Sequence, residues 1–492
     1  MNLENSLSIA SSGLNVIQYG MSTASQNIAN AETEGYIKED TNVETTSLNG
    51  IGAGVRAVPD SLSTNIQIQK ALYKQNANVS EYNTINNALS PIISMQGSVS
   101  ADPGETGTLT DQLGNIQSSL IQLTSSEDNY TLQNTVLARA NDFAQSVNNI
   151  ANVIQSQRQN AQNEINNNIS SINYNLTSIG NLSSQIMVMK NQGLDTTSLE
   201  NERFSALSSL SNTLQISWNI SSNGDMTIST KDGLTLPTHR SDNSISNKWP
   251  LSISLTNLSV DSFYEKNSLT TSIPGIMLQG KDATSHLSGG SLGANITLRD
   301  SILPKMQAQL DSLSYTVANR FSSQGMNLFT NSDKNSSNNV NGNEPSSILG
   351  FSQNFQVSSI YIQNSSFLSS KYKDVIQNIL QNTFSTNTPK APNINYGSNN
   401  ISTGYSGEQD ILSLATSLTS SQATTANNIQ NRLSLSENTQ KNLSSTLSKT
   451  SGVSIDKEMT NIVTLQNAYS ANAKVISMVQ SMFTTLMNAI GN

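Results

Sequence analysis

The fold is decided by residues 455–490, which read IDKEMTNIVTLQNAYSANAKVISMVQSMFTTLMNAI. This stretch contains no proline and no glycine, and its apolar residues recur at alternating steps of four and three. Such spacing is the heptad pattern of a coiled coil, in which one seam faces a partner helix. We therefore predict a long C-terminal helix with one polar residue, Asn472, in its seam. The seam comprises Leu465, Tyr469, Asn472, Ile476, Val479, Phe483, Leu486 and Ile490.

The first thirty residues carry the same spacing. Their seam comprises Leu3, Leu7, Ala10, Leu14, Ile17, Met21, Ala24, Ile28 and Ala31. Because both ends of the chain present such a seam, the simplest arrangement pairs the two terminal helices with each other, antiparallel. The alanines bury little area, so we expect the pair to be marginal alone and to become ordered on assembly. We predict that the two seams form the assembly interface of the chain.

The composition of the chain excludes or disfavours several classes of function. The 492 residues have a net charge of −9, only 12% charged residues and no cysteine. Without cysteine there is no disulfide, thiolate metal site or catalytic thiol. The acidic balance and the lack of a Lys/Arg run argue against binding to nucleic acid or to an anionic membrane surface. No apolar run is long enough for membrane insertion, and the amphipathic opening residues are unlike a cleaved signal peptide.

The rest of the chain changes its spacing twice. Residues 60–213 have mostly helical spacing, and a strand-like spacing of two begins at Leu214 and includes the hairpin signal Asn223-Gly224. Helical spacing returns after Gly293. We therefore expect a mainly α fold with a terminal coiled-coil domain, a long-helix bundle and a small inserted β domain. The predicted boundaries are 1–48 with 450–492 for the coiled coil, 49–213 with 294–449 for the bundle, and 214–293 for the β insert.

No group of residues in the sequence indicates catalysis. The two histidines, His239 and His286, lie in polar contexts typical of exposed loops. Glu200, Glu202 and Arg203 are close on one predicted helix, where an ion pair or a helix cap is the simplest interpretation. We therefore predict no enzyme activity, no cofactor and no metal site.

Three stretches resemble a known family. Residues 22–31 (STASQNIANA), followed by Gly35-Tyr36, resemble the N-terminal signature of the axial proteins of the bacterial flagellum, which form its rod, hook and hook-filament junction. Residues 453–459 (VSIDKEM) and 466–476 (QNAYSANAKVI) resemble the C-terminal signature of these proteins. In the middle, residues 199–203 (LENER) and 289–293 (GGSLG) are similar to the family of flagellar hook-associated protein 1, the hook-filament junction protein.

The resemblance implies a structural subunit of the hook-filament junction that self-associates in a helical ring and is required for filament assembly. It implies three further partners: hook protein, a second hook-associated junction protein, and a cytoplasmic export chaperone at the C-terminal helix. It also implies an extracellular location in the flagellum, reached through the flagellar type III export apparatus without a cleaved signal peptide.

Two other interpretations stay open. The signatures at both ends also fit a flagellar rod or hook subunit, although the long helical stretch 60–213 favours the junction protein. A different class is a secreted helical adhesin or effector with its binding activity in the β insert. The motility of a deletion strain would separate the flagellar interpretations from the adhesin.

Overall fold

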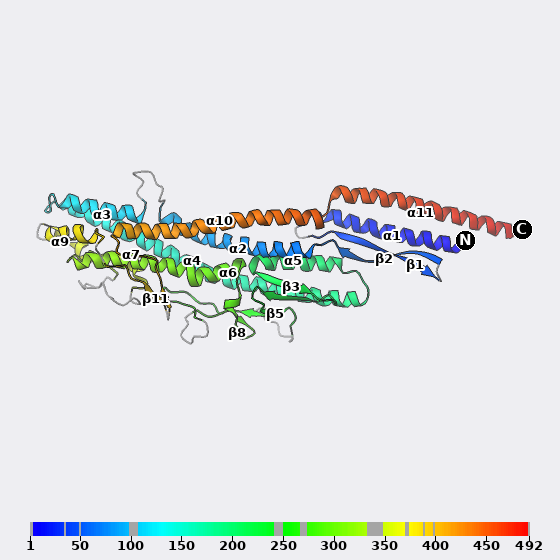
Figure 1. The fold of residues 1–492 in the computed structure, drawn as a ribbon, viewed down its shortest axis with the longest axis horizontal. Helices are drawn as coiled ribbons and strands as arrows, with labels where there is room; N and C mark the ends of the chain where they lie inside the picture. Colours follow the sequence, from blue (N-terminus) through cyan, green and yellow to red (C-terminus); the bar gives the residue numbers. More distant parts are fainter. Residues whose placement is uncertain are drawn as a thin grey trace. The chain divides into compact units, whose positions relative to one another are not determined.

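Long helices dominate the structure, and short strands lie between them (Figure 1). The computed structural model describes residues 3–33, 36–48, 51–97, 107–240, 249–265, 273–331, 348–369, 373–386, 389–396 and 399–490. The predicted mainly α fold is confirmed. Among the described residues, no helix combines the length and the apolar composition that a membrane span requires. The chain divides into two compact units, of which the first contains Met1–Val79, Ser171–Pro250 and Ser436–Asn492, and the second Ser80–Ser170 and Leu251–Leu435.

The two terminal helices lie in the first unit. α1 (Leu3–Ala29) and α11 (Ile455–Ile490) pack side by side and antiparallel, as the sequence predicted (Figure 1). An antiparallel hairpin of β1 (Glu39–Leu48) and β2 (Ile51–Leu62) also packs against α1. Two register shifts interrupt the hairpin, and such bulges bend and twist a strand pair. The N-terminal helix therefore contacts both α11 and the hairpin.

The first unit also contains α5 (Thr197–Thr213) and a three-stranded sheet of β3 (Ile216–Ile220), β4 (Met226–Thr230) and β5 (Thr235–Leu236). Buried and exposed residues alternate along β3, which places Trp218 on the buried face. The Trp218 ring lies 5.7 Å from the Phe204 ring of α5 and 6.5 Å from the Tyr73 ring of α2 (Ile66–Met95), measured between centroids. This aromatic cluster joins the sheet to the helices of the unit.

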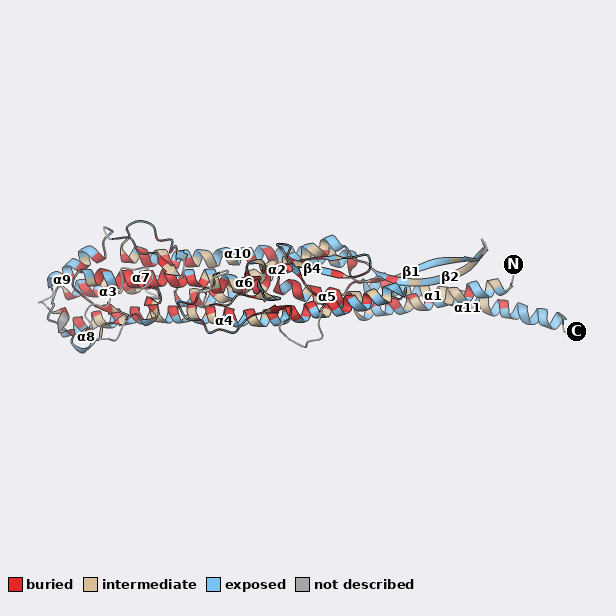
Figure 2. Cartoon of the chain, turned by 90° about the horizontal axis from the view of Figure 1, so that it is seen from below, coloured by how far each residue is buried: buried red, intermediate tan, exposed pale blue. Residues whose placement is uncertain are grey.

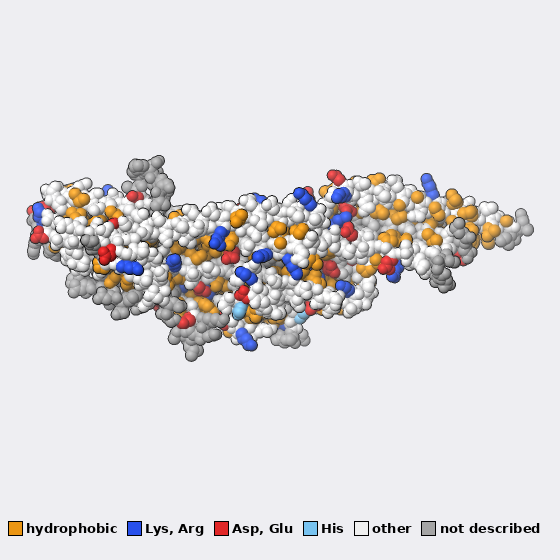
Figure 3. Space-filling model, viewed as in Figure 1, with side chains coloured by type: hydrophobic (Ala, Val, Ile, Leu, Met, Phe, Trp, Pro, Cys, Tyr) orange, Lys and Arg blue, Asp and Glu red, His pale blue; other side chains and the backbone are white. Residues whose placement is uncertain are grey.

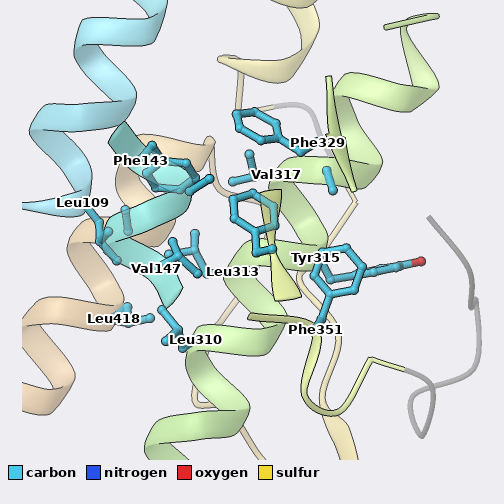
Figure 4. Close-up of a cluster of buried hydrophobic side chains, with 14 of the residues drawn as sticks. Leu109, Phe143, Val147, Leu310, Leu313, Tyr315, Val317, Phe329, Phe351 and Leu418 are labelled. Carbon is cyan, nitrogen blue, oxygen red and sulfur yellow. The ribbon is translucent and has the colours of Figure 1, made fainter. Parts of the chain in front are cut away.

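The second unit is a helical bundle with the larger apolar core. It contains α3 (Leu109–Leu123), α6 (Gly290–Thr297), α7 (Leu303–Ser323) and long parts of α4 (Tyr130–Asn191) and α10 (Ile411–Ser451). A capping box between Thr108 and Asp111 begins α3. Figure 4 shows Phe143 and Val147 of α4 pointing toward Leu310 and Leu313 of α7, all of them fully buried.

Short elements complete the second unit. β6 (Leu251–Ser252), β7 (Met277–Leu278) and β8 (Lys281–Asp282) form a second three-stranded sheet. Two strand pairs are β9 (Phe329–Thr330) with β10 (Gln356–Val357), and β11 (Ile394–Tyr396) with β12 (Asn399–Ile401). The short helices are α8 (Ser359–Gln363) and α9 (Lys373–Asn378).

The strands of residues 214–293 thus form two separate sheets, one in each compact unit. The sequence suggested one inserted domain because strand-like spacing shows where strands occur but not which strands pair. The boundaries drawn from the sequence also differ from those of the compact units. The three-domain division stays a prediction.

Candidate assembly interface

Glycine lets the two terminal helices approach each other closely. A Cβ atom at Gly13 of α1 would lie 3.3 Å from the side-chain nitrogen of Asn472 in α11. Seven residues later, a Cβ atom at Gly20 would lie 3.4 Å from a methyl carbon of Leu465. A Cβ atom at Gly13 would require the Asn472 side chain to move by a few tenths of an ångström, whereas one at Gly20 would make an ordinary van der Waals contact with Leu465. Our sequence reasoning missed these glycines, although their heptad spacing was a readable signal.

The predicted N-terminal seam coincides only in part with the face of α1 that contacts α11. Its buried members are Ala10, Ile17 and Ala24. Its half-buried members are Leu3, Leu14, Met21, Ile28 and Ala31. Leu7 is 37% exposed. Because consecutive residues of an α-helix are offset by about 100°, Leu14 and Met21 lie on the flank beside the two glycines. This flank of α1 therefore keeps accessible apolar surface.

The C-terminal seam is covered over its first part and open over its second. Val479 is buried, and the half-buried members are Leu465, Tyr469, Asn472 and Ile476. Further along, Phe483 is 43% exposed and Leu486 is 50% exposed. Figure 2 shows this uncovered end of α11 in pale blue. The side chain of Ile490 lies outside the described residues. That the two seams bind neighbouring copies of the chain stays a prediction.

A second group of apolar residues on α11 lies outside the predicted seam. Val475, Met478 and Met482 are 44%, 63% and 47% exposed. Their spacing of three and four residues places them along one flank of the helix. Figure 3 shows hydrophobic side chains gathered over α11. Extended apolar surface of this kind commonly marks a contact with another molecule. The heptad seam predicted from the sequence does not include this flank.

Asn27, from the N-terminal signature, links α1 to the hairpin through hydrogen bonds. Its amide nitrogen donates a hydrogen bond of 2.9 Å to the Glu39 carbonyl, and the Glu39 N–H donates one of 2.9 Å to Asn27 Oδ1. The Tyr36 hydroxyl donates to the same oxygen at 3.1 Å. Since Asn27 and Glu39 are both buried, the loss of this amide would leave both backbone groups without a partner. Gly35, which precedes Tyr36 in the N-terminal signature, lies outside the described residues.

Asn201, from the middle motif, holds the same segment from the side of α5. The Ile37 N–H donates to Asn201 Oδ1 at 3.0 Å, and the Asn201 amide nitrogen donates to the Ile37 carbonyl at 3.1 Å. The same nitrogen lies 3.2 Å from a carboxylate oxygen of Glu39. Two asparagines that are distant in the sequence therefore fix one short piece of backbone. Both belong to motifs that the sequence analysis could name but not explain.

Lys38 connects this segment to α11. Its ammonium group lies 2.9 Å from Asp40 and 3.3 Å from Glu458, a buried residue of the C-terminal signature. Burial lowers the pKa of Lys38, but hydrogen bonds to Asp40 and Glu458 and their charges raise it more, so that the net shift is upward. The Lys38 N–H also donates to the Ser451 carbonyl at 3.0 Å. The signatures at the two ends of the chain therefore meet at the hairpin.

Three carboxyl groups interact where α1 meets the hairpin. Burial raises the pKa of Glu39 and of Asp60, and the nearby charge of Asp195 raises both further. The Thr23 hydroxyl donates to Asp60 at 2.9 Å, and the Tyr19 hydroxyl donates to Asp195 at 3.2 Å. One oxygen of Asp60 is buried without a hydrogen-bond partner among the described residues. The contact between the hairpin and α1 therefore favours the neutral form of these carboxyl groups.

A cavity of about 300 Å³ lies between α1, β1 and α11. Apolar side chains and the charged side chains of Lys38, Glu39, Asp40 and Glu458 line it. Lys38 lies between Asp40 and Glu458 and compensates part of their charge, so that carboxyl groups outnumber cations in the lining. Among the described residues, no cluster of three or more His, Cys, Asp or Glu side chains is arranged to hold a metal ion.

The histidines weighed in the sequence analysis have ordinary surroundings. His239 Nε2 lies 2.9 Å from an Asp225 oxygen, and its other ring nitrogen lies 3.4 Å from the Ser184 hydroxyl. His286 belongs to a short 3-10 helix and is half-buried, which corrects the expectation of an exposed loop residue. Its Nδ1 atom is buried without a hydrogen-bond partner among the described residues.

The charged residues of the middle motif also have simple partners. Arg203 is buried and donates to the Gly224 carbonyl at 2.7 Å and to the Ser183 hydroxyl at 3.2 Å, whereas the sequence suggested an ion pair or a helix cap. Burial lowers the pKa of its guanidinium. The Glu200 carboxylate accepts a hydrogen bond of 2.9 Å from the Thr196 hydroxyl near the start of α5. These contacts stabilise the first unit.

Comparisons with known proteins point in one direction. The family model described as the flagellar hook-associated protein FlgK helical domain matches residues 97–336. A second family model, described as the flagellar basal body rod FlgEFG protein C-terminal, matches residues 445–489, which include most of α11. No curated protein matches the chain.

The solved structures that match the chain include one flagellar protein. It is the flagellar hook junction protein FlgK from Burkholderia pseudomallei, with 19% sequence identity and a TM-score of 0.41. The match covers 52% of this chain and 43% of that chain. The chain therefore spans less than half the length of the solved protein that it matches.

The two family models cover different parts of the chain, and together they span more than half of its 492 residues. Both are named for flagellar proteins, one for the hook-associated class and one for the rod class. The resemblance that we found in the middle and C-terminal signatures is thereby confirmed, and neither matched range includes the N-terminal signature. Over residues 97–336 the chain is similar to the helical domain of flagellar hook-associated proteins, and over residues 445–489 it is similar to the C-terminal part of flagellar rod proteins.

Proposed function

We propose that the chain is a structural subunit of the bacterial flagellum at the junction between hook and filament. It self-associates through the uncovered faces of α1 and α11 and is required for filament assembly. The observation that supports this most is the apolar end of α11, where Met482, Phe483, Leu486 and Met487 are 43% to 61% exposed. The proposal assigns the chain no catalytic role and no cofactor.

Energetics favour association with further copies. The face of α1 that meets α11 contains Gly13, Gly20 and Ala24, which bury little apolar area. Ordering a residue costs on the order of 1–2 kcal/mol of backbone entropy, whereas apolar burial contributes only ~25 cal/mol per Å². Contacts with the terminal helices of neighbouring copies add the missing burial. Head-to-tail contacts of this kind build helical rings.

The exposed end of α11 needs different partners at different stages. Before export, a cytoplasmic chaperone covers this helix and prevents premature association. The chain then passes unfolded through the flagellar type III export apparatus to an extracellular position, and its lack of cysteine means that no disulfide hinders unfolding. In the flagellum, hook protein lies on one side of the ring and the second hook-associated junction protein on the other.

A flagellar rod or hook subunit is the second candidate. The matched C-terminal family model is named for rod proteins, and the match extends over the 45 residues 445–489. The match to the hook-associated helical domain is much longer, since it extends over residues 97–336. The longer match favours the junction.

A deletion strain tests the proposed function. In a flagellated bacterium that carries this chain, its removal should leave hooks intact, abolish filaments and release filament subunits into the medium. The full-length chain supplied in trans should restore filaments. Loss of the hooks as well would favour the rod or hook subunit, and normal filaments would contradict both flagellar proposals.

A pair of matched variants tests the interface. Phe483→Asp places a charge in the uncovered part of the seam, whereas Thr485→Asp places one at an exposed polar position nearby. Phe483→Asp should abolish filament restoration while its melting temperature stays that of the wild type. Thr485→Asp should restore filaments. Equal restoration by both variants would show that the end of α11 is not an interface.

A further inference from the structure

Four methionines lie exposed on α11. Met459, Met478, Met482 and Met487 are 50%, 63%, 47% and 61% exposed. Met95, at the end of α2, is 43% exposed and is the one other methionine among the exposed large hydrophobic residues that the structure describes. By contrast, Met226, Met306 and Met326 are at most 3% exposed. Accessible thioether groups are thus concentrated on one helix.

We propose that these methionines form an oxidation-sensitive site that controls self-association of the free subunit. A peroxide such as hydrogen peroxide converts the α11 thioethers to sulfoxides and thereby blocks the contacts of the helix. The inference rests on the proposed function, because it requires that α11 binds neighbouring copies.

The chemistry needs only the peroxide and an accessible sulfur atom. A lone pair of the thioether sulfur attacks one peroxide oxygen, an S–O bond forms and the O–O bond breaks. The sulfur atom is oxidised by two electrons, and the peroxide is reduced to water after proton transfer to the departing oxygen. The chain has no cysteine, so no thiol of its own competes for the oxidant.

The positions of the methionines make the modification disruptive. Met478 and Met482 share a flank with Val475, and Met487 lies beside Leu486 at the uncovered end. A sulfoxide is polar and accepts hydrogen bonds, so its burial in an apolar contact is unfavourable. Methionine sulfoxide reductases reverse the reaction, which makes the site a switch rather than a lesion.

The first measurement locates the oxidation. The full-length chain is treated with dilute hydrogen peroxide, and sulfoxide at each methionine is followed by peptide mass spectrometry. Met459, Met478, Met482, Met487 and Met95 should oxidise at least about tenfold faster than the buried Met226, Met306 and Met326, because rates follow exposure. Similar rates at exposed and buried methionines would overturn the proposal.

In the second experiment, self-association is measured by sedimentation velocity. Oxidised wild-type chain should associate at least about tenfold more weakly than untreated chain, since each buried methionine contributes that much or more. A variant with leucine at 459, 478, 482 and 487 keeps apolar side chains of similar volume and should associate normally with or without peroxide. Met95→Leu is the control and should stay as sensitive as the wild type.

The outcomes separate this inference from the proposed function. If untreated chain fails to associate with itself, the proposed function and the inference are both wrong. If untreated chain associates and the oxidised chain associates equally well, only the inference is wrong. Persistent sensitivity of the four-leucine variant would also overturn it. Recovery of association after treatment with methionine sulfoxide reductases supports it.

Discussion

Asn27 and Asn201 position the start of the hairpin through hydrogen bonds between their side-chain amides and the backbone. Each side-chain amide pairs with the N–H and the C=O of a single residue, Glu39 for Asn27 and Ile37 for Asn201. An amide can do this because it carries both a donor and an acceptor. No other side chain of similar size satisfies both backbone groups at once.

Asn27→Ala should therefore destabilise the first unit. The variant leaves two buried backbone groups of Glu39 without partners, and each such group costs about 1–3 kcal/mol. Asn30→Ala is the control, because the Asn30 side chain makes an exposed hydrogen bond within the same helix. Its effect should stay within about 0.5 kcal/mol. Equal denaturant midpoints for the two variants would contradict the role of Asn27.

The buried carboxyl groups predict a dependence of stability on pH. Burial raises the pKa of Asp60 against the opposing hydrogen bond from Thr23, and burial also raises that of Glu39. The native state then binds protons more tightly than the unfolded chain. The free energy of unfolding is therefore highest below the ordinary carboxyl pKa and falls as the pH rises through the raised values.

Asp60→Asn removes one of these groups, so its stability should decrease less between about pH 4 and pH 7 than that of the wild type. Denaturant unfolding at several pH values measures the difference. Glu44→Gln changes an exposed carboxyl group of the same hairpin and should keep the wild-type slope. If the stability of Asp60→Asn changed with pH as much as that of the wild type, Asp60 would not contribute to the pH dependence of stability.

At the scale of elements, periodicity predicted both terminal helices and their antiparallel pairing. Heptad spacing is a local signal, and α1 and α11 are long enough to display it repeatedly. The same signal did not indicate that Leu7 lies exposed in the single chain or that Gly13 and Gly20 face α11. A pattern of apolar residues does not show where a glycine allows two helices to lie close together.

Asn472 tests what a polar residue in the seam does. A buried polar residue in a coiled coil commonly fixes register at some loss of stability. Asn472→Leu should therefore unfold at the same temperature as the wild type or higher, yet form assemblies of altered geometry by electron microscopy. Ile476→Leu should leave both properties unchanged. Clearly lower helicity of Asn472→Leu in assembled samples would show that Asn472 is needed for the helix itself.

Trp218 tests whether residues 214–293 form an independent domain. In the first unit its ring packs between helices, against Phe204 and Tyr73. Trp218→Ala should destabilise that unit by about 3–5 kcal/mol, which is usual for truncation of a large buried aromatic residue. The exposed Tyr174→Ala is the control. A negligible effect on the melting of the helices would support the sequence-based division, in which the insert folds apart from them.

At the scale of the whole molecule, the sequence predicted the class of fold but not which strands pair. Spacing shows that helices occupy 60–213 and that strands begin near residue 214. It does not show that β3–β5 and β6–β8 pair separately, because strand pairing depends on contacts between distant residues. The same limit explains Asn201, whose partners are more than 160 positions away in the sequence.

The central claim is that the terminal helices complete their burial only by association. The covered part of the seam ends near Val479, and α11 continues beyond it with exposed apolar residues. A chain built in this way carries its interface on the elements that are least stable alone.

Amide hydrogen exchange tests this claim most directly. Exchange is measured by mass spectrometry on a verified monomer and on assembled chain under identical conditions. We predict weak protection of residues 3–28 and 465–490 in the monomer, weakest from residue 480 onward, and strong protection of the same residues after assembly. Strong protection of both helices in the monomer, unchanged by assembly, would contradict the claim.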